Sequence, residues 1–106
     1  MQTEKRKRLE KAGWRVSDTR EFLGLTDSEA EFVEIKLALA RKVRQYREAH
    51  RWTQAEFARR VGSSQSRVAK MEAADPTVSV DLLVRSLLAA GANRREVGRV
   101  VSSSKA

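Results

Sequence analysis

Residues 53–72 read TQAEFARRVGSSQSRVAKME and predict two short helices joined by a tight turn. Thr53 and Glu56 have the spacing of a capping box, in which each side chain accepts a hydrogen bond from the other residue's backbone N–H. Small and apolar residues then recur at helical spacing until Gly62. A glycine suits this position because many helices end in a left-handed conformation that residues with a side chain avoid.

The second half of the stretch predicts a helix that begins just after the turn. Ser63 or Ser64 can cap it, since a serine oxygen can accept a hydrogen bond from the free N–H groups of the first turn. Val68 and Met71 are three residues apart, so they face the same way. Two helices of this length around one turn form a helix-turn-helix unit.

The chain resembles the Cro/C1-type (XRE) helix-turn-helix proteins, which include the lambdoid phage repressors. The resemblance runs from about Val43 to Leu88 and fixes small, apolar, polar and glycine positions together. The residues that carry it are Val43, Tyr46, Arg47, Trp52-Thr53-Gln54, Phe57-Ala58, Val61-Gly62, Gln65, Val68 and Met71-Glu72. Two residues depart from the family's pattern. Ser63 replaces an apolar residue of the turn, and Ala74 replaces a glycine common after the recognition helix.

The resemblance implies an all-α, lambda-repressor-like five-helix DNA-binding domain with an N-terminal extension. It also implies an ion pair between Arg47 and the glutamate that ends the recognition helix, Glu72. The wider pattern, with its N-terminal extension and its leucine-rich run at residues 82–89, also resembles HigA-like antitoxins. Such proteins bind operator DNA and also neutralise a toxin, which makes a RelE-like toxin protein an expected partner.

The composition favours a polyanionic partner and excludes several classes of protein. The formal net charge is +8 and the isoelectric point is near 10.6, which suits binding to nucleic acid. The sequence has no cysteine, so disulfides and thiolate metal sites are excluded. It shows no apolar run long enough to span a membrane and no secretory leader. We therefore expect a cytoplasmic protein.

Residues 1–26 form the expected N-terminal extension. Its basic centre, Lys5 to Arg8, suits a short helix or a free arm along a DNA backbone. Residues 14–17 alternate apolar with polar, a weak strand signal that would need a partner strand. The apolar residues Phe22, Leu23 and Leu25 predict packing on the body of the protein or on a second subunit.

Residues 27–101 form the expected helix-turn-helix domain, followed by a flexible tail at 102–106. Capping boxes at Thr26 and Asn93 and a cap at Ser79 mark three further helix starts. The first of these helices is predicted over residues 27–50. The residues expected to form its inward stripe are Phe32, Ile35, Leu39, Val43 and Tyr46. Core positions are predicted at Leu82, Leu83, Leu87 and Leu88 on the next helix and at Val97, Val100 and Val101 on the last.

A second apolar stripe on the first helix, at Val33 and Leu37, predicts another neighbour. A short recognition helix also contacts few base pairs, so it needs a second half-site. These two features together predict a homodimer.

The outward residues of the second helix of the unit are small or polar, as a helix that enters a DNA groove requires. Gln65, Ser66 and Lys70 are predicted to face base edges, since glutamine matches adenine and lysine matches the acceptors of guanine. Arg67 and Gln54 are predicted to face phosphates. The predicted DNA contacts are Gln54, Ser64, Gln65, Ser66, Arg67 and Lys70.

The sequence shows no glycine-rich phosphate loop, metal-ligand cluster or nucleophile–base motif. We therefore expect no catalytic residues, no metal and no cofactor, and we expect double-stranded DNA as the partner. RNA fits less well, because the major groove of an A-form helix is too deep and narrow for a reading helix. Two alternatives remain open: a protein-interaction module that neutralises a toxin and binds DNA secondarily, and a phage-type repressor.

Overall fold

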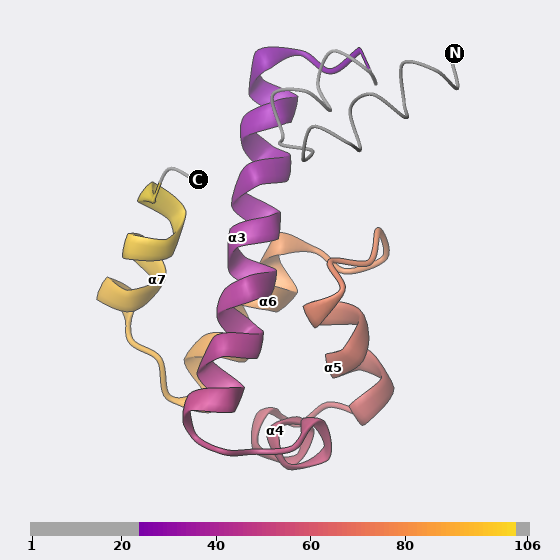
Figure 1. The fold of residues 1–106 in the computed structure, drawn as a ribbon, viewed down its shortest axis with the longest axis vertical. Coiled ribbons are helices and arrows are strands. Elements are labelled where there is room, and N and C mark those ends of the chain that lie inside the picture. The colour runs from indigo at the N-terminus through magenta and orange to yellow at the C-terminus, as the bar shows by residue number, and fades with distance from the viewer. Residues whose placement is uncertain (1–23, 104–106) are drawn as a thin grey trace, which may run out of the picture. The chain divides into compact units, whose positions relative to one another are not determined.

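The computed structural model describes residues 24–103, and this part of the chain forms five helices and no strand. The helices, shown in Figure 1, are α3 (Asp27–Ala49), α4 (Gln54–Val61), α5 (Gln65–Glu72), α6 (Val80–Ala90) and α7 (Arg94–Ser102). The predicted all-α five-helix fold is confirmed. The predicted basic arm, the strand at 14–17 and the segment at Phe22 lie outside the described residues.

The chain divides into two units, residues 1–34 and 35–106. The described part of the first unit contains the start of α3 and its predicted capping box. The backbone N–H of Thr26 donates to Glu29 Oε1 at 2.9 Å, and the N–H of Glu29 donates to Thr26 Oγ1 at 3.2 Å. This reciprocal pair satisfies two backbone groups, which fixes where α3 begins.

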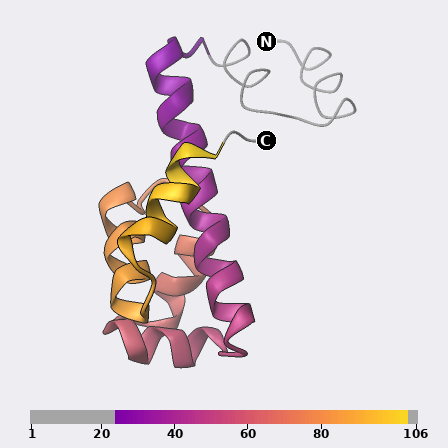
Figure 2. The same cartoon turned by 90° about the vertical axis from the view of Figure 1, so that its left-hand side faces the viewer.

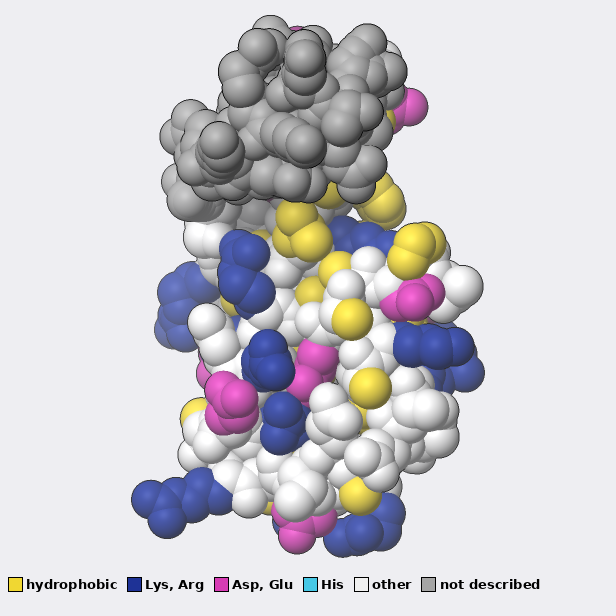
Figure 3. All heavy atoms as spheres, turned by 45° about the vertical axis from the view of Figure 1, so that its right-hand side comes forward, with side chains coloured by type: hydrophobic (Ala, Val, Ile, Leu, Met, Phe, Trp, Pro, Cys, Tyr) yellow, Lys and Arg dark blue, Asp and Glu magenta, His cyan; other side chains and the backbone are white. Residues whose placement is uncertain are grey.

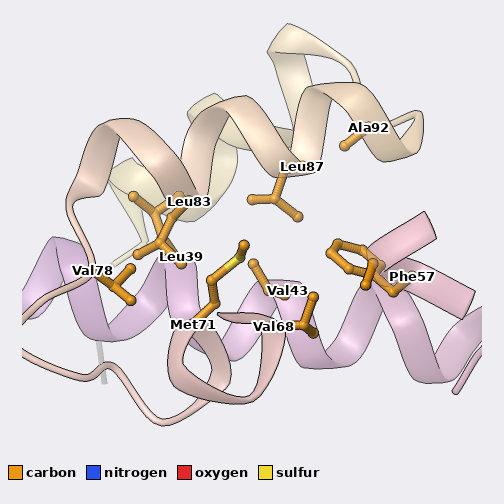
Figure 4. Packing of buried hydrophobic residues seen from close by; sticks show 10 residues of the cluster. Leu39, Val43, Phe57, Val68, Met71, Val78, Leu83, Leu87 and Ala92 are labelled. Atoms are coloured by element: carbon orange, nitrogen blue, oxygen red, sulfur yellow. The ribbon is translucent and has the colours of Figure 1, made fainter. Parts of the chain in front are cut away.

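The second unit encloses one hydrophobic core made by four helices (Figure 4). Leu39 and Val43 come from α3, Phe57 from α4, Val68 and Met71 from α5, and Leu83 and Leu87 from α6; all seven side chains are fully buried. Helices of eight residues such as α4 and α5 are not stable alone. Their burial against α3 and α6 is therefore what keeps them folded.

The other four helices also begin at a polar cap that the sequence predicts. Thr53, Ser64, Ser79 and Asn93 each accept a hydrogen bond from the backbone N–H three residues later. Thr53 and Asn93 complete full capping boxes with Glu56 and Glu96. Of the two serines at the turn, Ser64 is the cap.

The C-terminal ends of α3 to α6 share one geometry, a residue with positive φ just after the helix. Two of these residues are Gly62 at 72° and Gly91 at 120°, and two carry side chains, Arg51 at 60° and Ala74 at 53°. After α5, the N–H of Ala74 donates to Met71 O and that of Asp75 donates to Lys70 O, the Schellman pattern. Ala74 therefore holds the conformation of the glycine it replaces, at a cost in strain.

Three predicted core positions are wrong. Leu88 is 46 % exposed and Val101 41 % exposed. Leu87 and Leu88 are adjacent, so they point about 100° apart on a helix, and the core takes Leu87. Phe32 is 55 % exposed. Phe32 lies in the first unit of the chain and is not part of the hydrophobic core, whose residues all come from the second unit.

Candidate DNA-reading site

The unit of α4, turn and α5 is held by its own backbone and by a buried underside. The N–H of Gly62 donates to Arg59 O at 3.4 Å, and the N–H of Ser63 donates to Ala58 O at 2.8 Å, which closes α4 and turns the chain. Phe57 and Ala58 are the buried residues of α4, and Val68 and Met71 those of α5. Burial of these side chains thus fixes the orientation of α5 in the domain.

The outer face of α5 is a solvent-exposed row of small and polar side chains. Its exposed members are Gln65, Ser66, Arg67, Ala69, Lys70 and Ala73. The sequence predicts this division of α5 into an inward and an outward face, and the structure confirms it. Figure 3 shows polar surface on this side of the molecule with Lys and Arg side chains around it. The contacts of these residues with DNA stay predictions.

Ser64, also a predicted DNA contact, has its hydroxyl engaged in the protein. Its Oγ accepts from the N–H of Arg67 at 3.2 Å and lies 3.3 Å from Ser66 Oγ. The residue is exposed at the first turn of α5, where free backbone N–H groups attract phosphate. The Ser64 hydroxyl therefore caps the start of α5, and a contact with DNA through the same hydroxyl would have to share it with the cap.

The carboxylate of Glu72 joins three helices at the base of the reading unit. Arg47 Nε donates to Glu72 Oε2 at 2.6 Å and Arg47 Nη2 donates to Oε1 at 3.1 Å. The two side chains are only 14 % and 4 % exposed. Arg47 Nη1 also donates to the backbone oxygen of Trp52 at 3.0 Å. The bidentate hydrogen bonds to Glu72 raise the pKa of Arg47 further above its usual high value, and charge-assisted hydrogen bonds of this kind are stronger than those between neutral groups.

Gln54, a predicted phosphate contact, belongs to the same network. Its Nε2 donates to Glu72 Oε1 at 3.1 Å, and the side chain is half-buried. This bond fixes the amide at the first residue of α4, and the amide oxygen has no hydrogen-bond partner among residues 24–103. The sequence predicts Arg47–Glu72 through the family resemblance but not the bond to Gln54, because no local spacing connects residues 54 and 72.

Two further contacts around the unit escape sequence reasoning. The Arg60 guanidinium lies 4.3 Å from the centre of the Trp52 ring, a cation–π contact that ties α4 to the end of α3. Ser63 Oγ is buried and has no hydrogen-bond partner among the described residues, although the residue's backbone closes the turn. A buried hydroxyl without a partner destabilises the fold, which agrees with the apolar residue found at this position in the family that the sequence resembles.

Residues 24–103 contain no group of acidic or histidine side chains that could hold a metal ion. In the same described range, no helix is both long and apolar enough to cross a membrane.

Comparison with known proteins gives one family. No curated protein and no solved structure matched the chain. A family model described as a helix-turn-helix domain matches residues 38–100, from the middle of α3 through most of α7. This span is more than half of the chain, and it contains the α4–turn–α5 unit and its core. The chain therefore belongs to the helix-turn-helix domain family and is a DNA-binding regulator of that kind.

Proposed function

We propose that this protein is a sequence-specific transcriptional regulator of the Cro/C1 (XRE) type, a repressor that inserts α5 into the DNA major groove. The observation that carries the proposal is the exposed face of α5, which is polar or small along its length while the opposite face is fully buried. A helix held in this way can approach the bases closely because Ala69 and Ala73 add little bulk.

The residues divide into two roles in this proposal. Gln65, Ser66 and Lys70 read base edges, because amide and ammonium groups match the donors and acceptors that base pairs display in the major groove. Arg67, Gln54 and the start of α5 at Ser64 hold phosphates and set the register. The function is binding without catalysis, since these side chains lie on an open helix face that encloses no substrate.

A second subunit completes the proposed regulator. One recognition helix covers only a few base pairs, and a two-fold dimer reads two half-sites about one helical turn, roughly 34–36 Å, apart. We therefore propose a homodimer bound to a palindromic operator.

The test is selection of bound duplexes from random DNA, followed by titration of variants on the selected and on a scrambled duplex. Gln65→Ala and Lys70→Ala should each cost about 1–3 kcal/mol on the selected site and relax discrimination at one or two base pairs. Arg67→Ala should weaken binding to both duplexes alike and lower the salt slope by about one unit per half-site.

Matched controls for these variants come from α3 and α6. Gln45→Ala removes the same group as Gln65→Ala, and Arg85→Ala the same group as Arg67→Ala, from exposed positions outside the α4–α5 unit, so both should leave the titrations unchanged. If Gln65→Ala and Lys70→Ala keep the ratio of selected to scrambled affinity, the assignment of base-reading residues is wrong.

The antitoxin of a type II toxin–antitoxin system is the second candidate function. The resemblance to HigA-like proteins through residues 82–89 favours it, and it adds a RelE-like toxin as a protein partner. A small basic reading frame beside this gene, whose product co-purifies with the protein, would support the antitoxin role. A neighbouring integrase or phage cluster would favour a phage-type repressor.

A further inference from the structure

A second charged surface lies between α3 and α7, within the second unit of the chain. The two helices line an open groove of about 290 Å³, to which α3 contributes residues between 38 and 45 and α7 residues between 96 and 103. Figure 1 shows α7 and α5 on opposite sides of this part of α3, and Figure 2, which looks from the side of α7, shows α7 in front of α3. The groove is thus separate from the face proposed to bind DNA.

Both walls of the groove carry cations. Arg41 and Lys42 lie on the wall made by α3, and Arg99 lies on the wall made by α7. None of the three forms an ion pair with an acid among residues 24–103, although Lys42 Nζ lies 5.9 Å from the centre of the Tyr46 ring. Guanidinium groups bind carboxylates through two hydrogen bonds at once. Cations on two facing walls therefore suit a partner that carries several carboxylates.

The acid in the lining limits what the groove can accept. Glu96 lies on α7, three residues before Arg99, and its Oε1 accepts the N–H of Asn93 at 2.9 Å in the capping box. A nucleic-acid strand carries a negative charge on every phosphate, so part of it would face this carboxylate. A protein segment can instead place its acids opposite the cations and a neutral or basic residue opposite Glu96. The charge pattern of the groove therefore favours a protein segment over a nucleic acid.

We infer that the α3–α7 groove binds an acidic segment of a second protein, with carboxylates that reach both walls. Because the groove is open, it would bury too little of a small ligand, whereas a chain segment can lie in it and continue beyond its ends. Since α5 lies on the other side of α3, the partner can be bound while α5 contacts DNA. Binding of this partner goes beyond the proposed function and does not depend on it.

The test is binding of a fluorescein-labelled oligoglutamate peptide to the full chain, measured by fluorescence anisotropy. Arg41→Glu with Arg99→Glu should raise the dissociation constant about tenfold or more, because these changes remove two attractive pairs and add repulsion. Arg41→Gln with Arg99→Gln adds no negative charge and should raise the constant about threefold or more, as the loss of two exposed ion pairs does. Rising salt should weaken binding to the unsubstituted chain.

The matched control is Arg59→Glu with Arg85→Glu, which makes the same change in net charge at exposed positions outside the groove. It should change the dissociation constant by no more than about twofold, because salt screens exposed charges that are far from the peptide. A labelled oligolysine peptide tests the reversed groove: it should bind the chain with Arg41→Glu and Arg99→Glu more tightly than it binds the control chain. Circular dichroism melting reports the fold of each variant.

The backbone amide signals of the protein in nuclear magnetic resonance spectra locate the bound peptide. Oligoglutamate should shift the signals of residues 38–45 and 96–103. A peptide that shifts residues 65–73 instead, or that the control variant weakens as much as the groove variants do, would overturn the inference. Absence of binding at high micromolar concentration would also overturn it. So would an oligothymidylate strand that shifts the groove signals and binds there more tightly, since the occupant would then be a nucleic acid.

Discussion

Removing the carboxylate of Glu72 should cost this domain much of its stability. The carboxylate is 4 % exposed and accepts two hydrogen bonds from Arg47 and one from Gln54. Hydrogen bonds to charged groups contribute about 1.5–3 kcal/mol each. Loss of one partner of a buried pair typically costs about 3–5 kcal/mol because the other charge is left uncompensated.

The expected cost for Glu72→Ala is therefore about 3 kcal/mol, at the lower end of that range. Two features place it there: the Arg47 side chain retains 14 % exposure, and its Nη1 keeps the bond to Trp52 O. Arg44 also lies near the carboxylate, at 3.8 Å, but its side chain is 62 % exposed. Arg44→Ala should cost no more than about 0.5 kcal/mol, as exposed ion pairs do, and it is the matched control.

The measurement is urea unfolding near neutral pH and physiological salt, in a double-mutant cycle of Glu72→Ala and Arg47→Ala. We expect a coupling free energy of about 2 kcal/mol between the two positions. Glu72→Gln keeps the volume and removes the charge, so most of the cost should persist in it. A coupling below about 0.5 kcal/mol, within the error of additivity, would refute the reasoning that this pair holds the three helices together.

Three further changes test the ends of the helices and one partly buried phenol. Gly91→Ala should destabilise the domain by about 2 kcal/mol or more, because φ is 120° and a Cβ would lie 2.9 Å from the Tyr46 hydroxyl. Adding Tyr46→Phe to this variant should recover part of the lost stability in a melting experiment. Ala74→Gly should stabilise the domain by about 0.5–1 kcal/mol, since relief of left-handed strain exceeds the added freedom of the unfolded chain. Ala73→Gly is the control: φ is −85° there, so this change should destabilise the domain in the same urea assay. Burial, with a smaller contribution from the charge of Glu96, raises the pKa of Tyr46. The stability that the neutral phenol adds to the fold is complete below the pKa of the unfolded chain, near 10, and is lost as pH rises through the pKa of the folded chain. Tyr46→Phe should abolish that loss of stability at alkaline pH.

Local features of this fold were predictable because their causes are local. A cap needs only a short polar residue and a free N–H three positions later, so Thr53, Ser79 and Asn93 could be assigned from the sequence. The inward pair Val68 and Met71 follows from helical spacing alone. The same holds for the exposed face of α5, and therefore for the surface from which the predicted DNA contacts are drawn.

Features that depend on packing were not predictable in the same way. Leu87 and Leu88 are equally apolar, and only the position of the neighbouring helices decides which one is buried. The bond from Gln54 to Glu72 joins residues that are distant in sequence, so no spacing rule could propose it. Ala74 is a mixed case: the departure from the family's glycine was visible in the sequence, but only the structure shows that the backbone keeps positive φ.

The network at Glu72 connects stability with DNA reading through charge as well as geometry. A lone carboxylate at the end of α5 would repel a DNA phosphate and weaken binding. Here the carboxylate is bonded by Arg47 and lies 3.8 Å from Arg44, whose Nε is also 3.7 Å from Glu48 Oε2, so two cations stand beside the two acids. The same carboxylate holds the amide nitrogen of Gln54, which fixes the side chain at the first residue of α4. An acid at this position thus fixes the residues around it, and its charge is balanced by arginines beside the surface that we propose meets DNA.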